Sequence, residues 1–118
     1  MTPTQGIINF NEARNLVSNF SRSNEISMLK QEIAELEAAV MAGDTNEIAK
    51  ELSDIIILAT GHLYKEGFNP DLALKQKVKE VSSRTGHIGA EGKWLKDPNQ
   101  PASEKYSANM LVCKRTGH

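Results

Sequence analysis

Residues 31–58 read QEIAELEAAVMAGDTNEIAKELSDIIIL, and this stretch carries four acidic residues arranged symmetrically about its one glycine. These residues are Glu32, Glu35, Glu51 and Asp54. The inner two each lie 8 positions from Gly43, and the outer two each lie 11 positions from it. On antiparallel helices that turn at this glycine, a rise of about 1.5 Å per residue puts all four at one level, with helix axes roughly 8 to 10 Å apart. The pattern therefore predicts a four-carboxylate cluster inside a helical hairpin.

Apolar residues on both sides of the glycine recur every three or four positions, as in helices that pack along one side. Before the glycine they are Ile26, Leu29, Ile33, Leu36 and Val40, and after it they are Ile48, Leu52, Ile55, Ala59 and His62 or Leu63. The acidic residues fall beside these two rows, with Glu32 and Glu35 sharing a face with Met28 and Ala39. We therefore expect them to border a core.

The turn between the two helices has recognisable chemistry. Gly43 can adopt the left-handed conformation that ends many helices, and Asp44 or Thr45 can cap the next helix, which we expect over about 46–65. Residues 55–58 of that helix are apolar on almost every side, so they need neighbours that a lone hairpin cannot supply. A bundle or a dimer is required.

Two further helices flank the hairpin. Before it, Phe10, Ala13, Val17 and Phe20 have helical spacing, with Asn9 as the cap. After it, Asn69 and Pro70 are typical of a helix start, followed on the apolar side by Leu72, Leu74, Val78 and Val81. The fold predicted is all-α: a four- to five-helix bundle with a central antiparallel hairpin, an irregular C-terminal tail and an oligomeric assembly. We expect the bundle over 1–85 and a Gly/Pro-rich tail over 86–118, within the same domain. A last short helix over 103–113 is compatible with the pattern.

Composition narrows the class of protein. A formal net charge of -1 gives no excess of cations for nucleic acid or an acidic membrane, and no apolar run is long enough to span a bilayer. The N-terminal residues lack the basic and apolar regions of a secretory signal. The single cysteine, Cys113, cannot form an internal disulfide, which favours a reducing compartment. These features predict a cytoplasmic protein.

Clustered carboxylates repel one another unless a cation compensates them. Oxygen ligands without nearby cysteine suit Mg²⁺ or Mn²⁺, and such sites commonly hold substrate phosphates as well. Lys77 and Arg84 lie seven residues apart along one helix edge, where they can hold phosphate oxygens. The alternative is that each acidic pair is solvated helix surface, but their symmetric placement at the edge of both apolar rows favours the metal site.

Other reactive or aromatic residues give weaker signals. His62 is better interpreted as a packed ring than as a ligand, and Cys113 has no partner in sequence for thiol catalysis. The glycines after residue 85 fail the spacing of a phosphate-binding loop and favour a flexible connector. Trp94 and Tyr106 could stack on a base or attach the tail to the bundle, and the sequence leaves both open.

The spacing E-x-x-E on one helix and E-x-x-D on the next resembles the all-α nucleotide pyrophosphatase superfamily, the MazG-like proteins. Relatives include dimeric dUTPases, dCTP pyrophosphatases and phosphoribosyl-ATP pyrophosphatases. The resemblance covers about residues 26–84. It implies an oligomeric helical bundle that binds Mg²⁺ and cleaves a nucleotide to a monophosphate and pyrophosphate. It also implies that Glu32, Glu35, Glu51 and Asp54 are metal ligands, and that Lys77 and Arg84 contact the substrate.

The match is incomplete at several positions. Gln31 stands where many relatives have an acid, and Val81 where an Asn is common. Residues 55–57 lack the Tyr and His that tend to follow the second motif in phosphoribosyl-ATP pyrophosphatases. The resemblance therefore assigns metal ligands to this sequence, but it assigns no residues to recognition of the base or the sugar. A non-catalytic dimerisation module and a degenerate nucleotide-binding regulator remain as alternatives to a nucleoside triphosphate pyrophosphohydrolase. A simple module would have no reason to place Lys77 and Arg84 towards the acids.

Overall fold

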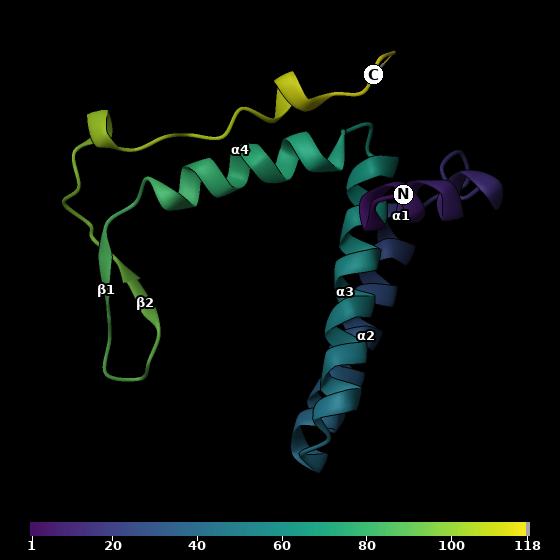
Figure 1. Ribbon diagram of the computed structural model, residues 1–118, viewed down its shortest axis with the longest axis horizontal. Helices are drawn as coiled ribbons and strands as arrows, with labels where there is room; N and C mark the ends of the chain where they lie inside the picture. The colour runs from purple at the N-terminus through teal and green to yellow at the C-terminus, as the bar shows by residue number, and fades with distance from the viewer. Residues whose placement is uncertain (118) are drawn as a thin grey trace.

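Two long helices, α2 (Arg22–Ala42) and α3 (Thr45–Lys65), form an antiparallel hairpin to which the other elements attach (Figure 1). The computed structural model describes residues 1–117. Within that range, helices α1 (Pro3–Ala13) and α4 (Pro70–Ser82) flank the hairpin in sequence, and the remaining elements are short. The all-α class predicted from the sequence is confirmed. No helix of the described residues is both long enough and apolar enough to cross a membrane.

The turn of the hairpin follows the predicted chemistry. Gly43 has a φ of 67°, the left-handed conformation, and its N–H donates to the carbonyls of Ala39 and Val40. The Asp44 side chain accepts a hydrogen bond from the Glu47 N–H at 3.1 Å, so it caps α3. These local contacts end one helix and start the next within three residues. They fix which positions of α2 and α3 lie opposite each other.

Helix α1 differs from its predicted position. The predicted helix began at Asn9 and ran through Phe20, whereas α1 begins after Thr2 and ends at Ala13. The Thr2 side chain accepts a hydrogen bond from the Gln5 N–H, and Pro3 presets the backbone for the first turn. Asn15, with a φ of 54°, then interrupts the helical path before the later apolar residues.

Helix α1 packs against α3 through a close contact at Gly61. Asn11 of α1 is buried, and a Cβ atom added at Gly61 would lie 3.0 Å from Asn11 Nδ2. Asn11 Nδ2 also donates to the carbonyl of Ile7 at 2.8 Å. The glycine therefore lets a polar side chain of α1 approach the backbone of α3, and α1 covers one side of α3 near the open end of the hairpin.

Helix α4 starts as predicted but leads away from the hairpin. Asn69 caps it, accepting from the Leu72 N–H at 3.1 Å, and Pro70 is its first residue. From the α3–α4 junction, α4 extends as an arm, and the C-terminal segment returns along it (Figure 1). Main-chain bonds anchor the return near the junction, where the Asn69 N–H donates to the Cys113 carbonyl at 2.7 Å. The arm therefore consists of α4 and the C-terminal segment that runs alongside it.

The tail is more ordered than the sequence predicted. Strands β1 (Gly86–Ile88) and β2 (Trp94–Lys96) pair antiparallel, with His87 opposite Leu95, so these glycines are part of a β-hairpin and not a flexible connector. Gly86 is required there because an added Cβ would lie 2.2 Å from the Leu95 carbonyl oxygen.

The prediction of a short helix over residues 103–113 was wrong. The chain instead forms two 3₁₀ turns, η1 (Ala102–Glu104) and η2 (Met110–Cys113). Between them, the Tyr106 N–H donates to Ser83 Oγ at 2.8 Å and the Ala108 N–H donates to Glu80 Oε1 at 3.0 Å. Because these amides bond to α4 and its end, they cannot form a local helical ladder.

The chain buries little apolar surface. Among the described residues, the buried apolar side chains are those of Ala39, Pro70, Ala73 and Cys113, whereas Ile56 is 62% exposed. The accessible surface is 8366 Å², against about 6,300 Å² expected for a folded monomer of this mass. The radius of gyration is 17.1 Å, against about 13 to 14 Å for a compact domain of this length. One chain therefore leaves roughly 2,000 Å² more surface uncovered than such a monomer.

Candidate functional site

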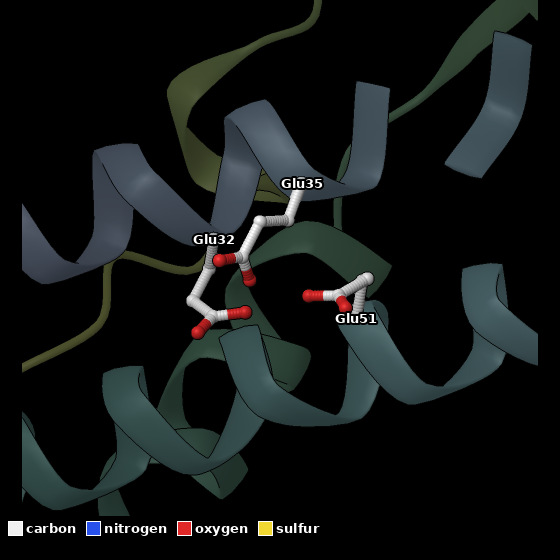
Figure 2. Close-up of side chains that lie close together, drawn as sticks. All are labelled: Glu32, Glu35 and Glu51. Carbon is white, nitrogen blue, oxygen red and sulfur yellow. The ribbon is translucent and has the colours of Figure 1, made fainter. Parts of the chain in front are cut away.

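The hairpin brings three of the four predicted carboxylates together. Glu32 and Glu35 lie one turn apart on α2, and Glu51 faces them from α3 (Figure 2). One carboxylate oxygen from each lies within 4.8 Å of the other two. The cluster exists because the turn at Gly43 sets the two antiparallel helices in register. The mirrored spacing correctly predicted that these three side chains lie close together, whereas their role as metal ligands stays a prediction.

The cluster contains acceptor oxygens that lack donors. Glu32 Oε2 and Glu51 Oε2 are buried, and no group within residues 1–117 hydrogen-bonds to either. Two carboxylates can bond to each other only when one of them carries a proton. The pKa of Glu32 is raised to about 7 because its protonated form can bond to Glu51, and because desolvation and the nearby charge of Glu35 disfavour its ionised form. Carboxylates with these properties form a fitting ligand set for a divalent cation, which would neutralise the repulsion and occupy the orphaned oxygens.

Asp54 lies at the edge of this cluster. It is three residues after Glu51 on α3 and is exposed, and its carboxylate is not one of the three mutually close groups. Its negative charge still contributes to raising the pKa of Glu32. Asp54 is therefore an electrostatic neighbour of the three-glutamate cluster in a single chain.

Lys77 and Arg84 converge on a carboxylate of their own helix. Lys77 Nζ pairs with Glu80 Oε2, and Arg84 Nη2 lies 3.2 Å from the same oxygen. These contacts, with Lys77 first, lower the pKa of Glu80. Helix α4 leads away from the α2–α3 hairpin (Figure 1), and no hydrogen bond or ion pair within residues 1–117 joins Lys77 or Arg84 to the three glutamates.

Ion pairs hold the open end of the hairpin. Arg22, at the start of α2, donates two hydrogen bonds of 2.8 Å to the Glu66 carboxylate just after α3. His62 Nε2 lies 2.9 Å from the same carboxylate, and its ring is half-buried beside Phe20. The packed role expected for His62 is confirmed. Lys65 and Glu25 form a second pair at 2.5 Å with both side chains buried. These contacts restrain the two helices beyond the cluster.

The Glu66 pair predicts how stability depends on pH. Hydrogen bonds from Arg22 and then His62 lower the pKa of Glu66 from 4.5 to about 2. Its stabilising effect is therefore complete above pH 4.5 and is lost as the pH falls towards 2. Urea denaturation at stepped pH should give a steeper loss of unfolding free energy for the wild type than for Glu66→Gln across this range. Parallel pH profiles for the two proteins would contradict this role.

Sequence reasoning did not single out Gln76 and Ser83, which bond the tail, whereas attachment of the tail was one of the two roles left open for Tyr106. Tyr106 attaches the tail to α4: its hydroxyl bonds Gln76 Oε1, and Lys79 Nζ lies 4.2 Å from its ring centre. Trp94 is 57% exposed. The β-hairpin had a signal in the sequence, because Ile88 on one side and Trp94 and Leu95 on the other flank residues 89–92, which contain two glycines. Cys113 is buried and bonds the Asn109 carbonyl, consistent with a structural role.

A family match places the chain in the MazG-like all-α nucleotide pyrophosphatase superfamily, and the hairpin with its acidic cluster agrees with the arrangement expected from the resemblance. A family model described as phosphoribosyl-ATP pyrophosphohydrolase matches residues 17–82, more than half of the chain. The chain belongs to this family, whose members are hydrolases that act on phosphoanhydride bonds of nucleotides. Comparisons with curated proteins and with solved structures found no match.

Proposed function

We propose that the protein is a Mg²⁺-dependent nucleoside triphosphate pyrophosphohydrolase, which releases a nucleoside monophosphate and pyrophosphate. The observation that carries this proposal is the cluster of Glu32, Glu35 and Glu51, with two buried carboxylate oxygens that lack a donor within the described chain. Family membership supports the same class of reaction. A hydrolysis screen over nucleotides, run with Mg²⁺ and with EDTA, tests it.

The metal ligands we propose are the three clustered glutamates together with Asp54. All are hard oxygen donors, which suit Mg²⁺, with Mn²⁺ as a substitute. When bound, the ion supplies positive charge to phosphate oxygens and lowers the pKa of a bound water. The carboxylates fix where that charge lies relative to the substrate, and the half-buried setting of Glu32 and Glu51 limits competition from solvent.

Magnesium should stabilise the folded protein through this cluster. At a concentration of 100 times its dissociation constant, a ligand of the native state adds about 2.7 kcal/mol, which corresponds to roughly 10 °C in Tm for a domain of this size. Thermal unfolding should show that rise in the wild type and little of it in Glu51→Gln. In EDTA the variant should be at least as stable as the wild type, because one repulsive charge is gone. An equal Mg²⁺ effect on both proteins would count against the site.

We infer that Lys77 and Arg84 act at the glutamate cluster of a second chain. Helix α4 leads away from the α2–α3 hairpin of its own chain (Figure 1), and the exposed apolar side chains of α3 and α4 are available for association. We propose a homodimer or homotetramer in which the arm of one copy reaches the cluster of another. The uncovered surface of roughly 2,000 Å² per chain is in the range buried by obligate homodimers.

Association should be measurable by light scattering at micromolar concentration. The expected mass is at least twice the 13.0 kDa of one chain. Ile56→Asp places a charge on the α3 surface that is now 62% exposed, and it should lower the mass towards that of the monomer. A wild-type monomer under these conditions would contradict the proposed assembly and with it the shared site.

The family description and the sequence constrain the base and sugar less than the bond that is cleaved. Residues Gln31 and Val81 depart from the pattern common among relatives, and the family description names phosphoribosyl-ATP without fixing the substrate of this chain. The proposal concerns the bond that is cleaved, between the first and second phosphates. A cytoplasmic location is proposed with it, because nucleoside triphosphates and Mg²⁺ are both present there.

A further inference from the structure

A polar pocket of about 270 Å³ lies at the end of the arm, outside the segment that the family model matches. It is formed where the end of α4, strand β2 and the following loop meet. The side chains that line it include Arg84, Lys96 and Lys105. In a single chain the arm leads away from the α2–α3 hairpin, so this pocket is distinct from the three-glutamate cluster (Figure 1).

The walls of the pocket are held by hydrogen bonds to the end of α4. Gln100 is 7% exposed; its Nε2 donates to the Ser83 carbonyl at 2.7 Å, and its Oε1 accepts from the Thr85 N–H at 2.8 Å. On the other side of the loop, the Tyr106 N–H donates to Ser83 Oγ. A buried amide that bonds main-chain groups on both sides fixes the loop. The pocket is therefore a built feature of the fold.

The pocket has an excess of positive charge. Three cations line it against one carboxylate, that of Asp97. Both Asp97 oxygens already accept hydrogen bonds, from Thr85 Oγ1 at 3.2 Å and from the Asn99 N–H at 3.1 Å. Arg84 also forms an ion pair with Glu80. Lys96 and Lys105 have no ion-pair partner within residues 1–117.

The size and donors of the pocket select a class of ligand. Pockets for whole drug-sized ligands are about 300 to 1,000 Å³, so a volume of about 270 Å³ suits a small group. Two lysines and an arginine supply donors but no acceptors, and arginine matches phosphate geometry. We propose that this pocket binds a phosphate-type anion through Lys96, Lys105 and Arg84. The anion is either free phosphate or pyrophosphate, or a phosphate group of a nucleotide whose remainder lies outside the pocket.

Calorimetric titration in EDTA tests this site without any hydrolysis, so it is informative whether or not the protein is a pyrophosphohydrolase. Inorganic phosphate and pyrophosphate are the probes, at low ionic strength. We expect binding of one anion per chain. The double variant Lys96→Met with Lys105→Met keeps the alkyl stems and should weaken binding at least tenfold, since two charge-assisted contacts are lost. The matched variant Lys96→Arg with Lys105→Arg, which keeps both charges, should retain binding.

Lys93→Met is the control, because Lys93 lies in the same β-hairpin but does not line this pocket. Its affinity should equal that of the wild type. Failure of the wild type to bind either probe at millimolar concentration would overturn the proposal. An equal loss of affinity in the control and in the double Met variant would overturn it as well, because it would indicate a diffuse electrostatic effect.

Two further experiments identify the source of the anion. Glu51→Gln should bind phosphate at least as tightly as the wild type in EDTA, because Glu51 does not line this pocket and its carboxylate offers the anion no donor; a loss of binding there would overturn the assignment to this pocket. The second experiment uses a nucleotide that the wild type hydrolyses. A raised KM for this substrate in the Lys96→Met, Lys105→Met variant identifies the nucleotide's own phosphate as the occupant of the pocket. An unchanged KM, with phosphate binding still weakened, identifies the free anion. Both KM results support the pocket as the phosphate site.

Discussion

Glu51→Gln should lower kcat/KM for nucleoside triphosphate hydrolysis by about 1,000-fold or more. Glu51 is the α3 member of the cluster, and one of its oxygens is buried without a donor in the described chain. The amide has nearly the same volume but replaces a charged oxygen by an N–H donor, which repels a cation. Losing several kcal/mol of transition-state stabilisation corresponds to this factor. Initial rates with saturating Mg²⁺ measure it.

Glu37→Gln is the matched control for this substitution. Glu37 lies on α2 and is exposed, with no hydrogen bond or ion pair within residues 1–117, so its variant should keep wild-type rates. Glu35→Gln and Asp54→Asn should also lose activity while circular dichroism stays helical. Retained activity in Glu51→Gln, with the fold intact, would remove the glutamate cluster from the reaction.

Lys77→Ala should lower kcat by roughly 10- to 1,000-fold, with a smaller change in KM. Lys77 is half exposed on the arm and bonds Glu80. We expect it to neutralise charge on phosphate oxygens, and this contact strengthens as charge develops in the transition state. Arg84 still pairs with Glu80 after the substitution, so that carboxylate keeps a partner. Steady-state kinetics separate the two parameters.

Lys75→Ala serves as the control on the same helix. Lys75 is exposed and forms no ion pair within the described residues, so kcat should not change. If Lys77→Ala raises KM and leaves kcat unaltered, Lys77 contributes equally to substrate and transition-state binding, and the electrostatic role is wrong. If both parameters stay at wild-type values, Lys77 is not in the site.

The hairpin and most of its cluster could be predicted because their causes are local. Gly43 and Asp44 define the turn through contacts within a few residues, and Asn69 with Pro70 define the start of α4 in the same way. Once the turn is fixed, helical geometry decides which carboxylates face each other. Asp54 has a shorter side chain than the glutamates and lies outside the mutually close group, which backbone spacing alone does not determine.

Other features depend on contacts between distant residues and could not be predicted from local patterns. The arm is held by the returning C-terminal segment, for example through Asn69 and Cys113, which are far apart in sequence. The predicted helix over 103–113 failed because Tyr106 and Ala108 donate to Ser83 and Glu80. For α1, the apolar spacing after Phe10 was outweighed by a cap and proline near the N-terminus.

The identity of the products tests the proposed function most directly. Each nucleoside triphosphate should be incubated with the protein and Mg²⁺, and the products followed by phosphorus NMR, which separates pyrophosphate from orthophosphate. We predict a nucleoside monophosphate and intact pyrophosphate from at least one substrate, and no reaction in EDTA. A nucleoside diphosphate with released orthophosphate, or Mg²⁺ and nucleotide binding without turnover of any triphosphate, would contradict the assignment as a pyrophosphohydrolase.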